Sequence, residues 1–183
     1  MNKILCGDSA TVLKDIPDGI VKCFVTSPPY YNVRDYETDG QIGRESNVGI
    51  YIHNLLKVFE ELYRVLDDNG TGWIVIGDKY EKGQLLGIPW RLALGLQELG
   101  WIIRNESIYH KKTPKPESAR NRLSRIYETV FLVSKKPSGY YFDLESIKIP
   151  AKSSVNKEFS FVGERELHLG RSLTEEERQR NIR

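Results

Sequence analysis

Apolar residues recur along the chain at two spacings, one typical of strands and one typical of helices. Five short apolar runs, rich in β-branched and aromatic residues, predict strands at 3–6, 21–26, 72–76, 101–109 and 129–133. Between them, apolar residues at steps of three and four predict helices at 10–16, 52–66 and 89–99. The second helix is expected to end in the turn Asp67–Gly70. The alternation predicts an α/β fold with a mostly parallel sheet flanked by helices.

Three of the predicted strands end in short turns that carry polar or aromatic groups. These turns are Gly7-Asp8, Ser27-Pro28-Pro29-Tyr30 and Gly77-Asp78. In parallel α/β sheets the functional residues gather where the strands end, at the carboxyl edge. We therefore expect all three turns to meet at one edge of one sheet.

The composition is that of an ordinary soluble protein. The 183 residues are 39% hydrophobic and 28% charged. No apolar run approaches the roughly 20 residues that a membrane helix needs, and the first residues lack the apolar stretch of a signal peptide. We expect a cytoplasmic protein with one domain at 1–150 and a polar extension at 151–183, which holds a predicted charged helix at 172–180.

Cysteines and histidines are too few to indicate a disulfide framework or a metal site. Cys6 and Cys23 both lie in apolar runs, where we expect them to be buried and reduced. Three histidines without a Cys-x-x-Cys pair disfavour structural zinc, so no metal is predicted.

The net charge of +2 says little, but its distribution is uneven. Basic residues outnumber acidic ones between Arg104 and Arg125, and most of them fall in a loop predicted at 110–125, beside prolines. We call residues 110–125 the basic loop. Such a cluster suits the binding of a polyanion, and it equally suits a solvated surface. The charges alone favour neither interpretation.

The turn Ser27-Pro28-Pro29-Tyr30 is the most informative stretch of the chain. Two successive prolines fix the backbone and remove two N–H donors, so the turn presents carbonyl oxygens without competing donors. With the Ser27 hydroxyl, these oxygens can accept both hydrogens of an amino group, and Tyr30 offers a flat face for a ring. Holding both N–H bonds favours the pyramidal, nucleophilic form of an aromatic amine. Taken alone, the two prolines are also consistent with a rigid strand exit.

The combination of these motifs resembles the amino-directed DNA methyltransferases of the β arrangement, in which the catalytic half precedes the cofactor-binding half. The similar segments are Gly7-Asp8, Ser27–Tyr31, Asn32–Tyr36, Gly40–Gly43, Gly77–Tyr80, Gly87–Arg91, His110–Pro114, Pro116–Ser118 and Arg125–Glu128. The resemblance implies a Rossmann-like methyltransferase fold, S-adenosylmethionine as cofactor and DNA as substrate. The serine in the turn is more typical of cytosine-N4 enzymes than of adenine-N6 enzymes.

The resemblance also implies roles for individual residues. Ser27 and the Pro28 carbonyl would hold the target amine, with Pro29 completing the turn, and Tyr30 would stack on the extruded base. Asp8 matches a position near the adenine of the cofactor, and Ser27 also borders the cofactor; a loop cap is the equal alternative for Asp8. Tyr109 matches an aromatic position that holds the flipped base, with a core strand residue as its alternative.

The basic loop would then contact phosphates near the flipped base. The candidate residues for DNA binding are Lys111, Arg120, Asn121, Arg122 and Arg125, with Asn121 as a base reader. Cytosine-C5 methylation is disfavoured, because neither cysteine follows a proline.

One feature of the family was not found. No Phe-x-Gly-x-Gly turn follows the fifth predicted strand, although that turn holds the methionine part of the cofactor in the family. We therefore expect an incomplete sheet with an unpaired edge, and an isolated chain with weak or no activity. A split enzyme with a second chain, a truncation and a self-associating remnant all remain open.

Two further classes of function are compatible with the sequence. One is a non-catalytic DNA-binding or regulatory remnant of such an enzyme. The other is a methyltransferase that acts on RNA or on a protein side-chain amide, since related Pro-Pro-Tyr turns handle planar amines of both kinds. The basic loop favours DNA.

Overall fold

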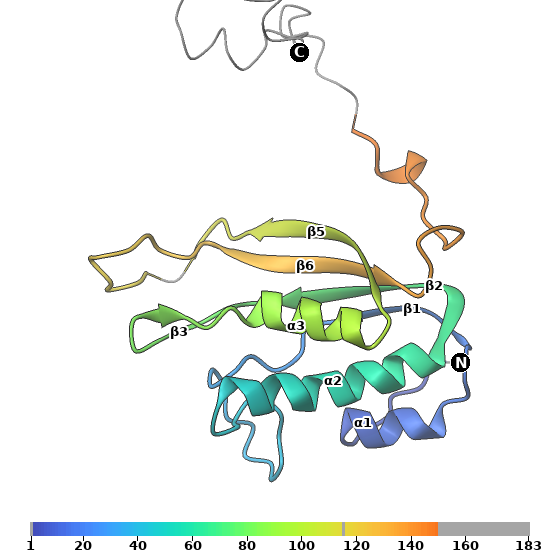
Figure 1. Ribbon diagram of the computed structural model, residues 1–183, viewed down its shortest axis with the longest axis horizontal. Helices are drawn as coiled ribbons and strands as arrows, with labels where there is room; N and C mark the ends of the chain where they lie inside the picture. Colours follow the sequence, from blue (N-terminus) through green and yellow to red (C-terminus); the bar gives the residue numbers. More distant parts are fainter. Residues whose placement is uncertain (1, 115, 150–183) are drawn as a thin grey trace, which may run out of the picture. The chain divides into compact units, whose positions relative to one another are not determined.

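A four-stranded mixed sheet forms the centre of the computed structural model, which describes residues 2–114 and 116–149 (Figure 1). The strands are β1 (Val21–Thr26), β2 (Leu66–Ile76), β5 (Ile102–His110) and β6 (Tyr127–Ser134), in the order β1-β2-β6-β5. Strands β1 and β2 are parallel, whereas β6 is antiparallel to both β2 and β5. Four of the five predicted strands are therefore confirmed, but the sheet is mixed rather than mostly parallel.

The connections between strands explain this mixture. A long helix, α2 (Val48–Val65), lies between β1 and β2 and returns the chain to the starting end of the sheet, so these strands run the same way. Among the described residues between β5 and β6, which the basic loop joins, there is no helix. A chain that turns back directly pairs antiparallel. The sequence pattern predicted the strands but did not show that β6 reverses.

Residues 3–6 do not form the predicted strand. Ile4 is 96% exposed and Leu5 46% exposed, and both Cys6 and Cys23 are exposed. The predicted burial of the two cysteines is therefore wrong. Within the described residues no strand pairs with residues 3–6 or with the outer edge of β1. Apolar side chains at these positions consequently find no surface to pack on.

Residues 67–70, where a turn is predicted, fall within the bounds of β2 but form an irregularity in it. The register with β1 steps from the pair Val21–Leu66 to the pair Cys23–Thr71, so none of these four residues has a partner on β1 within the described part of the chain. The Asn69 amide donates to the Asp67 carboxylate at 2.8 Å, and Lys22 forms an ion pair with the same carboxylate at 2.6 Å. The turn-forming residues thus interrupt the ladder instead of joining it.

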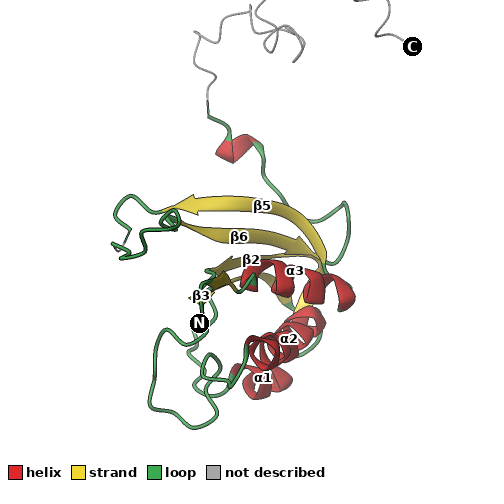
Figure 2. Cartoon of the chain, turned by 60° about the vertical axis from the view of Figure 1, so that its left-hand side comes forward, coloured by secondary structure: helices red, strands yellow, loops and turns green. Residues whose placement is uncertain are grey.

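The helices pack on one face of the sheet, as Figures 1 and 2 show. Besides α2, they are α1 (Ser9–Val12), the 3₁₀ turn η1 (Leu13–Asp15) and α3 (Ile88–Glu98). The core joins Ile74 and Phe131 of the sheet to Phe59 of α2 and Leu92 of α3. Asn47 caps α2 by accepting from the amide of Ile50 at 3.0 Å. These contacts hold α2 and α3 against the strands that lead into the site.

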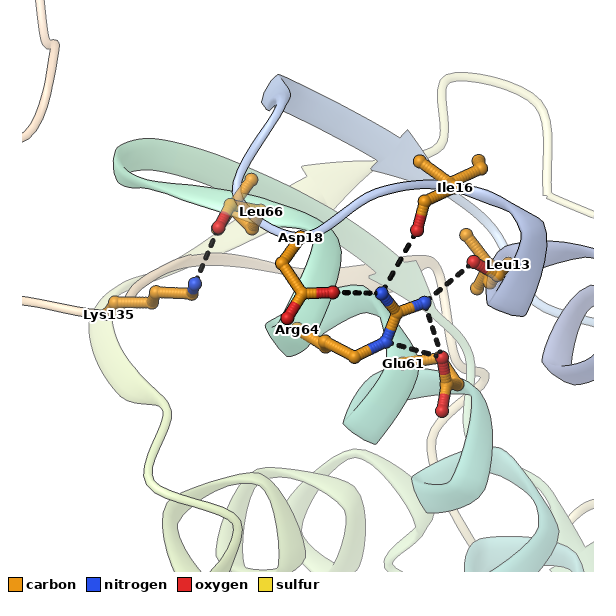
Figure 3. Close-up of polar contacts among 7 residues, drawn as sticks. All are labelled: Leu13, Ile16, Asp18, Glu61, Arg64, Leu66 and Lys135. Atoms are coloured by element: carbon orange, nitrogen blue, oxygen red, sulfur yellow. Dashed lines mark hydrogen bonds and ion pairs between the residues drawn. The ribbon is translucent and has the colours of Figure 1, made fainter.

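Arg64, in the last turn of α2, ties this helix to the α1–η1 segment (Figure 3). Its guanidinium donates to the carbonyls of Leu13 at 2.8 Å and Ile16 at 3.0 Å. It also pairs with Asp18 and with Glu61. Both carboxylates raise the pKa of Arg64. The chain segment that leads into β1 is therefore fixed to α2 by one side chain.

Two small elements complete the description. A hairpin of β3 (Tyr80–Glu81) and β4 (Gln84–Leu85) separates β2 from α3, and a 3₁₀ turn, η2 (Glu145–Ile147), lies in the second of two compact units, Met1–Phe142 and Asp143–Arg183. The extension at 151–183 and its predicted helix at 172–180 lie outside the described residues. No helix among the described residues is long and apolar enough to cross a bilayer.

Candidate active site

A cavity of about 450 Å³ lies where β1 ends and β6 begins. Because β1, β2 and β5 run in one direction, their carboxyl ends and the start of β6 share one edge of the sheet. The cavity is lined by Ser27, Pro28, Pro29, Tyr30, Val33, Arg34, Tyr36, Lys111 and Glu128. The edge expected from the sequence is thus the edge that carries a cavity, and all four residues of the Ser-Pro-Pro-Tyr turn line it.

The turn is held from behind by groups that leave little room. The Tyr51 hydroxyl of α2 donates to the Pro29 carbonyl at 2.8 Å. A side chain at Gly77 would come within 2.9 Å of the Tyr30 ring, and one at Gly43 within 3.2 Å of the Tyr30 carbonyl. Gly43 also has a φ of 104°, which favours glycine. Close packing on both sides therefore fixes the turn and the Tyr30 ring.

These contacts divide the acceptors of the turn into used and available ones. The Pro29 carbonyl is already paired with Tyr51. Within residues 2–114 and 116–149, no donor pairs with the Pro28 carbonyl. The Ser27 side chain is exposed at the cavity. Ser27 and the Pro28 carbonyl are thus the acceptors left for an incoming amino group.

Tyr30 keeps its proton over the ordinary pH range. Burial raises the pKa of its hydroxyl to about 12, a hydrogen bond with Ser27 opposes this rise, and the Glu128 carboxylate adds to it. The Ser27 and Tyr30 hydroxyl oxygens lie 3.4 Å apart. Tyr30 is therefore a neutral ring that can both stack and donate one hydrogen bond.

An ion pair between Lys111 and Glu128 closes one side of the cavity. The Lys111 ammonium lies 2.6 Å from the Glu128 carboxylate, and the Lys111 amide donates to the Ile126 carbonyl at 2.8 Å. The sequence predicts that Lys111 binds DNA, but it indicates no role for Glu128. The only sequence signal for Glu128 was its place in the segment Arg125–Glu128, which resembles the methyltransferases.

Tyr109 lies beside this cavity rather than in it. It stands on β5 opposite Glu128 and is 58% exposed, so the alternative of a core residue is wrong. Tyr109 lines a second cavity of about 530 Å³ with His110, Lys111, Lys112, Thr113 and Glu128. The two cavities share Lys111 and Glu128. An exposed ring next to the 450 Å³ cavity is consistent with the predicted contact to a base.

Asp8 caps helix α1, and Asp78 accepts from the first amide of helix α3. Asp8 accepts from the amide and the hydroxyl of Thr11 at 2.9 Å each, at the start of α1. Asp78 accepts from the amides of Lys79 at 2.8 Å and Ile88 at 3.0 Å, at the start of α3. The Asp78 side chain is 1% exposed and also pairs with Arg125 at 3.2 Å. Neither aspartate lines the 450 Å³ cavity.

The arginines of the basic loop have different surroundings. Arg122 pairs with Glu117 and stacks on the ring of Tyr80, with 3.7 Å between the guanidinium carbon and the ring centre. Arg125 reaches buried Asp78. Arg120 and Asn121 are exposed. Two of the three arginines predicted to contact DNA are therefore held by partners inside the protein.

The DNA methylase family, whose name refers to N6 and N4 methyltransferases, matches residues 21–180 of this chain. The chain belongs to this family. A relative, the type II methyltransferase M.SmaI of Serratia marcescens, is 39% identical over 178 residues, which cover 81% of the chain and 61% of the relative. The type II methyltransferase M.SfiI of Streptomyces fimbriatus is 42% identical over 165 residues, which cover 81% of the chain and 39% of the relative. The chain thus spans roughly half the length of these methylases.

Solved structures agree with the family assignment. A protein from Thermus thermophilus, described as a DNA modification methylase and complexed with S-adenosyl-L-methionine, matches with a TM-score of 0.58 and 27% identity, over 76% of this chain and 57% of that one. The cytosine-N4-specific PvuII DNA methyltransferase matches with a TM-score of 0.59 at 20% identity, over 71% of this chain and 48% of that one, and supports the fold alone. The described residues of this chain have a Rossmann-like α/β fold with a partial sheet.

Within the described residues, no group of three or more histidine, cysteine, aspartate or glutamate side chains is placed to hold a metal ion. The acceptors of the site are instead a hydroxyl, a carbonyl and a paired carboxylate. Such a set suits a neutral amine and a flat ring.

Proposed function

We propose that this chain carries the catalytic and target-recognition part of a DNA methyltransferase that transfers a methyl group from S-adenosylmethionine to an exocyclic base amine. Cytosine N4 is favoured over adenine N6, because the turn begins with serine. One observation carries the proposal: Ser27 and the Pro28 carbonyl are the free acceptors of a rigid turn, beside the stacking face of Tyr30, in one cavity.

The geometry favours the nucleophilic form of the amine. Its two N–H bonds would be taken by the Ser27 oxygen and by the Pro28 carbonyl, which lie in one cavity with Tyr30. Fixing both hydrogens draws the nitrogen toward a pyramidal form, whose lone pair is no longer delocalised into the ring. The packing behind the turn keeps these acceptors in place before the base arrives.

The described residues fit only part of the cofactor. When bound, S-adenosylmethionine supplies an electrophilic methyl group. Ser27, and the second carboxylate oxygen of Asp8, are the candidates to border it, because Thr11 occupies only one oxygen of Asp8. No glycine-rich strand–turn–helix cradle lies among the described residues. The methionine part of the cofactor therefore needs a contribution from elsewhere.

The outer edge of β1 is where we place that contribution. This strand ends the order β1-β2-β6-β5 and pairs with β2 alone within the described part of the chain. Val25 is 72% exposed, and Cys23 is exposed as well. An open edge with apolar side chains can pair with a further strand. We propose that a further polypeptide segment, from a continuation of the same chain, a partner chain or a second copy, completes the sheet here.

The DNA contacts are proposed for exposed residues of the basic loop. We propose that Arg120, which is exposed, contacts a phosphate, and that Asn121, also exposed, reads a base edge. Arg122 and Arg125 instead hold the loop against Tyr80 and Asp78. Tyr109, on the neighbouring cavity, is the proposed aromatic contact to the extruded base.

The decisive experiment identifies the methylated nucleoside. The protein, together with the segment that completes its sheet, is incubated with labelled S-adenosylmethionine and unmethylated bacterial DNA, and the DNA is digested to nucleosides, which are separated. N4-methylcytosine is the expected product, and Ser27→Ala is the control with strongly reduced activity. N6-methyladenine would overturn the base preference, and label found only in RNA or in protein would overturn the DNA assignment.

A second measurement tests the need for a further segment. We expect the isolated chain to transfer methyl groups weakly or not at all. A cofactor-binding titration with DNA present distinguishes an enzyme from a non-catalytic remnant, since the remnant would not bind S-adenosylmethionine. Full turnover by the isolated chain would overturn the proposed further segment and leave the methyl-transfer proposal intact.

A further inference from the structure

Four polar side chains line the cavity as two pairs, one of hydroxyl groups and one of opposite charges. They are Ser27 with Tyr30, and Glu128 with Lys111. The Ser27 hydroxyl lies 3.4 Å from the Tyr30 hydroxyl, and the Glu128 carboxylate lies 2.6 Å from the Lys111 ammonium. Tyr30 and Glu128 line the same cavity. The Glu128 carboxylate raises the pKa of Tyr30 both by its charge and as acceptor of the phenol proton. The two pairs therefore line one cavity, and the hydrogen bond from Ser27 leaves the proton of the Tyr30 hydroxyl available for Glu128.

Proton counting gives these two pairs a direction. Lys111 has only donors, and an ionised carboxylate has only acceptors, so the ion pair keeps Glu128 negative. Tyr30 has one proton, and a carboxylate is a stronger acceptor for it than the neutral Ser27 hydroxyl. The Tyr30 oxygen can then accept the proton of Ser27. The lone pairs of the Ser27 oxygen are left free on the side of the cavity.

We propose that Glu128 is a positioning residue that acts through Tyr30 to turn the Ser27 hydroxyl, so that Ser27 accepts a hydrogen bond from the target amine. Lys111 fixes the Glu128 carboxylate in the orientation that this requires. The inference rests on the proposed function and deepens it, because it explains how a serine, which can also donate, is restricted to accepting. Aspartate at the same position would need no such restriction, since an ionised carboxylate only accepts.

Burial and position support a dedicated role for Glu128. Its side chain is only 14% exposed, although it stands near the start of β6, at the end of the sheet where the cavity lies. A carboxylate in such a place is costly unless it is paired. Lys111, itself 38% exposed, supplies the pair from the neighbouring strand end. The two residues flank the cavity without occupying the Ser27 acceptor.

The test compares Glu128→Gln and Tyr30→Phe with the double variant. Glu128→Gln keeps the size of the side chain and removes its charge, and Tyr30→Phe keeps the stacking ring and removes the hydroxyl. We expect each change to lower kcat about tenfold, which is the worth of one oriented hydrogen bond, with the KM for DNA unchanged. The double variant is expected to be no slower than the single ones, because Glu128 acts through Tyr30. Methyl transfer is measured in whichever form of the protein, alone or with its partner segment, is active.

A spectroscopic arm tests the same link without methyl transfer. Tyrosine labelled with ¹³C at Cζ reports the protonation of Tyr30, whose signal is assigned by its loss in Tyr30→Phe. Removing the Glu128 charge should lower the pKa of Tyr30, because that charge raises it in the native protein. Glu106→Gln, a matched change on the exposed part of β5, should alter neither kcat nor this pKa.

The outcomes separate the two proposals. If the native protein transfers methyl groups and Glu128→Gln leaves kcat unchanged, or if the effects of the two single variants multiply, the positioning role is overturned. If no form of the protein methylates DNA, the proposed function fails, and an unchanged Tyr30 pKa in Glu128→Gln would still overturn the positioning role. If Glu128→Gln does not fold, a native kcat in Tyr30→Phe overturns it instead.

Discussion

The Ser-Pro-Pro-Tyr turn and the basic loop meet at the same edge of the sheet, yet they are built in opposite ways. The turn depends on backbone atoms and on residues that fix the backbone, such as Pro28 and Pro29. The basic loop depends on long side chains whose destinations differ: Arg125 reaches buried Asp78, whereas Arg120 stays exposed. A site that consists of backbone acceptors can therefore be recognised from neighbouring residues in the sequence. The role of each arginine in the basic loop, in contrast, depends on which distant residues surround it.

The largest expected effect concerns the anchor of the basic loop. Asp78→Ala removes the partner of Arg125 and the acceptor of the Ile88 amide, and should destabilise the protein by about 3 kcal/mol, because a partly buried arginine loses its counter-charge. Asp68→Ala is the matched control, since the Asp68 side chain is 71% exposed and should matter by less than about 0.5 kcal/mol. Urea unfolding measures both, and equal losses would show that the loop has no buried anchor.

The second effect concerns the turn. Ser27→Ala removes one of the two free acceptors, and we expect kcat to fall by about 100-fold, in the range found when one preorganised hydrogen-bonding group is removed. The free energy of unfolding should stay close to that of the native protein, because the Ser27 side chain is exposed. Ser124→Ala, in the exposed part of the basic loop, is the control. A native kcat in Ser27→Ala would remove the turn from the chemistry.

The third effect separates the arginines within the loop. Arg120→Ala should weaken DNA binding and reduce the slope of log K against log salt by about one, because one phosphate contact is lost. Arg125→Ala should instead lower the stability of the protein, since it leaves the buried Asp78 carboxylate without its counter-charge. Fluorescence anisotropy at several salt concentrations measures the slope. Equal slopes in Arg120→Ala and the native protein would show that Arg120 contacts no phosphate.

The smallest effect is a pH dependence of the contacts that Glu117 makes within the basic loop. The Arg122 guanidinium lowers the pKa of Glu117, and the amide of Arg125, which donates to Glu117 at 3.3 Å, adds to this. A lowered pKa means that the stabilisation is present at pH values above the ordinary range of a carboxyl group and is lost as the pH falls through the lowered value. The amide signal of Arg125 should follow this titration in NMR spectra. In Glu117→Gln the change should disappear, and its persistence would assign it to another group.

Much of the fold was predictable because periodicity reports burial directly. The strand at 21–26 has the predicted bounds, and the helix predicted at 52–66 is found at 48–65. The strand predicted at 3–6 does not form, and its apolar side chains are exposed. An apolar run becomes a buried strand only where a neighbouring strand or helix covers it. Residues 67–70 fall within the bounds of β2, but they interrupt its pairing with β1, as the preference of Asp-Asp-Asn-Gly for turns predicts.

Most of the helices and strands, the family resemblance and the turn with its carbonyl and hydroxyl acceptors follow from the sequence alone, because they depend on residues close together in the chain. The antiparallel direction of β6, the partners of Arg122 and Arg125, and the position of Glu128 beside Lys111 in the cavity of Tyr30 depend on the tertiary structure. Ion pairs and sheet pairing join residues far apart in the sequence, and a local pattern contains no information about which distant partner will be in reach.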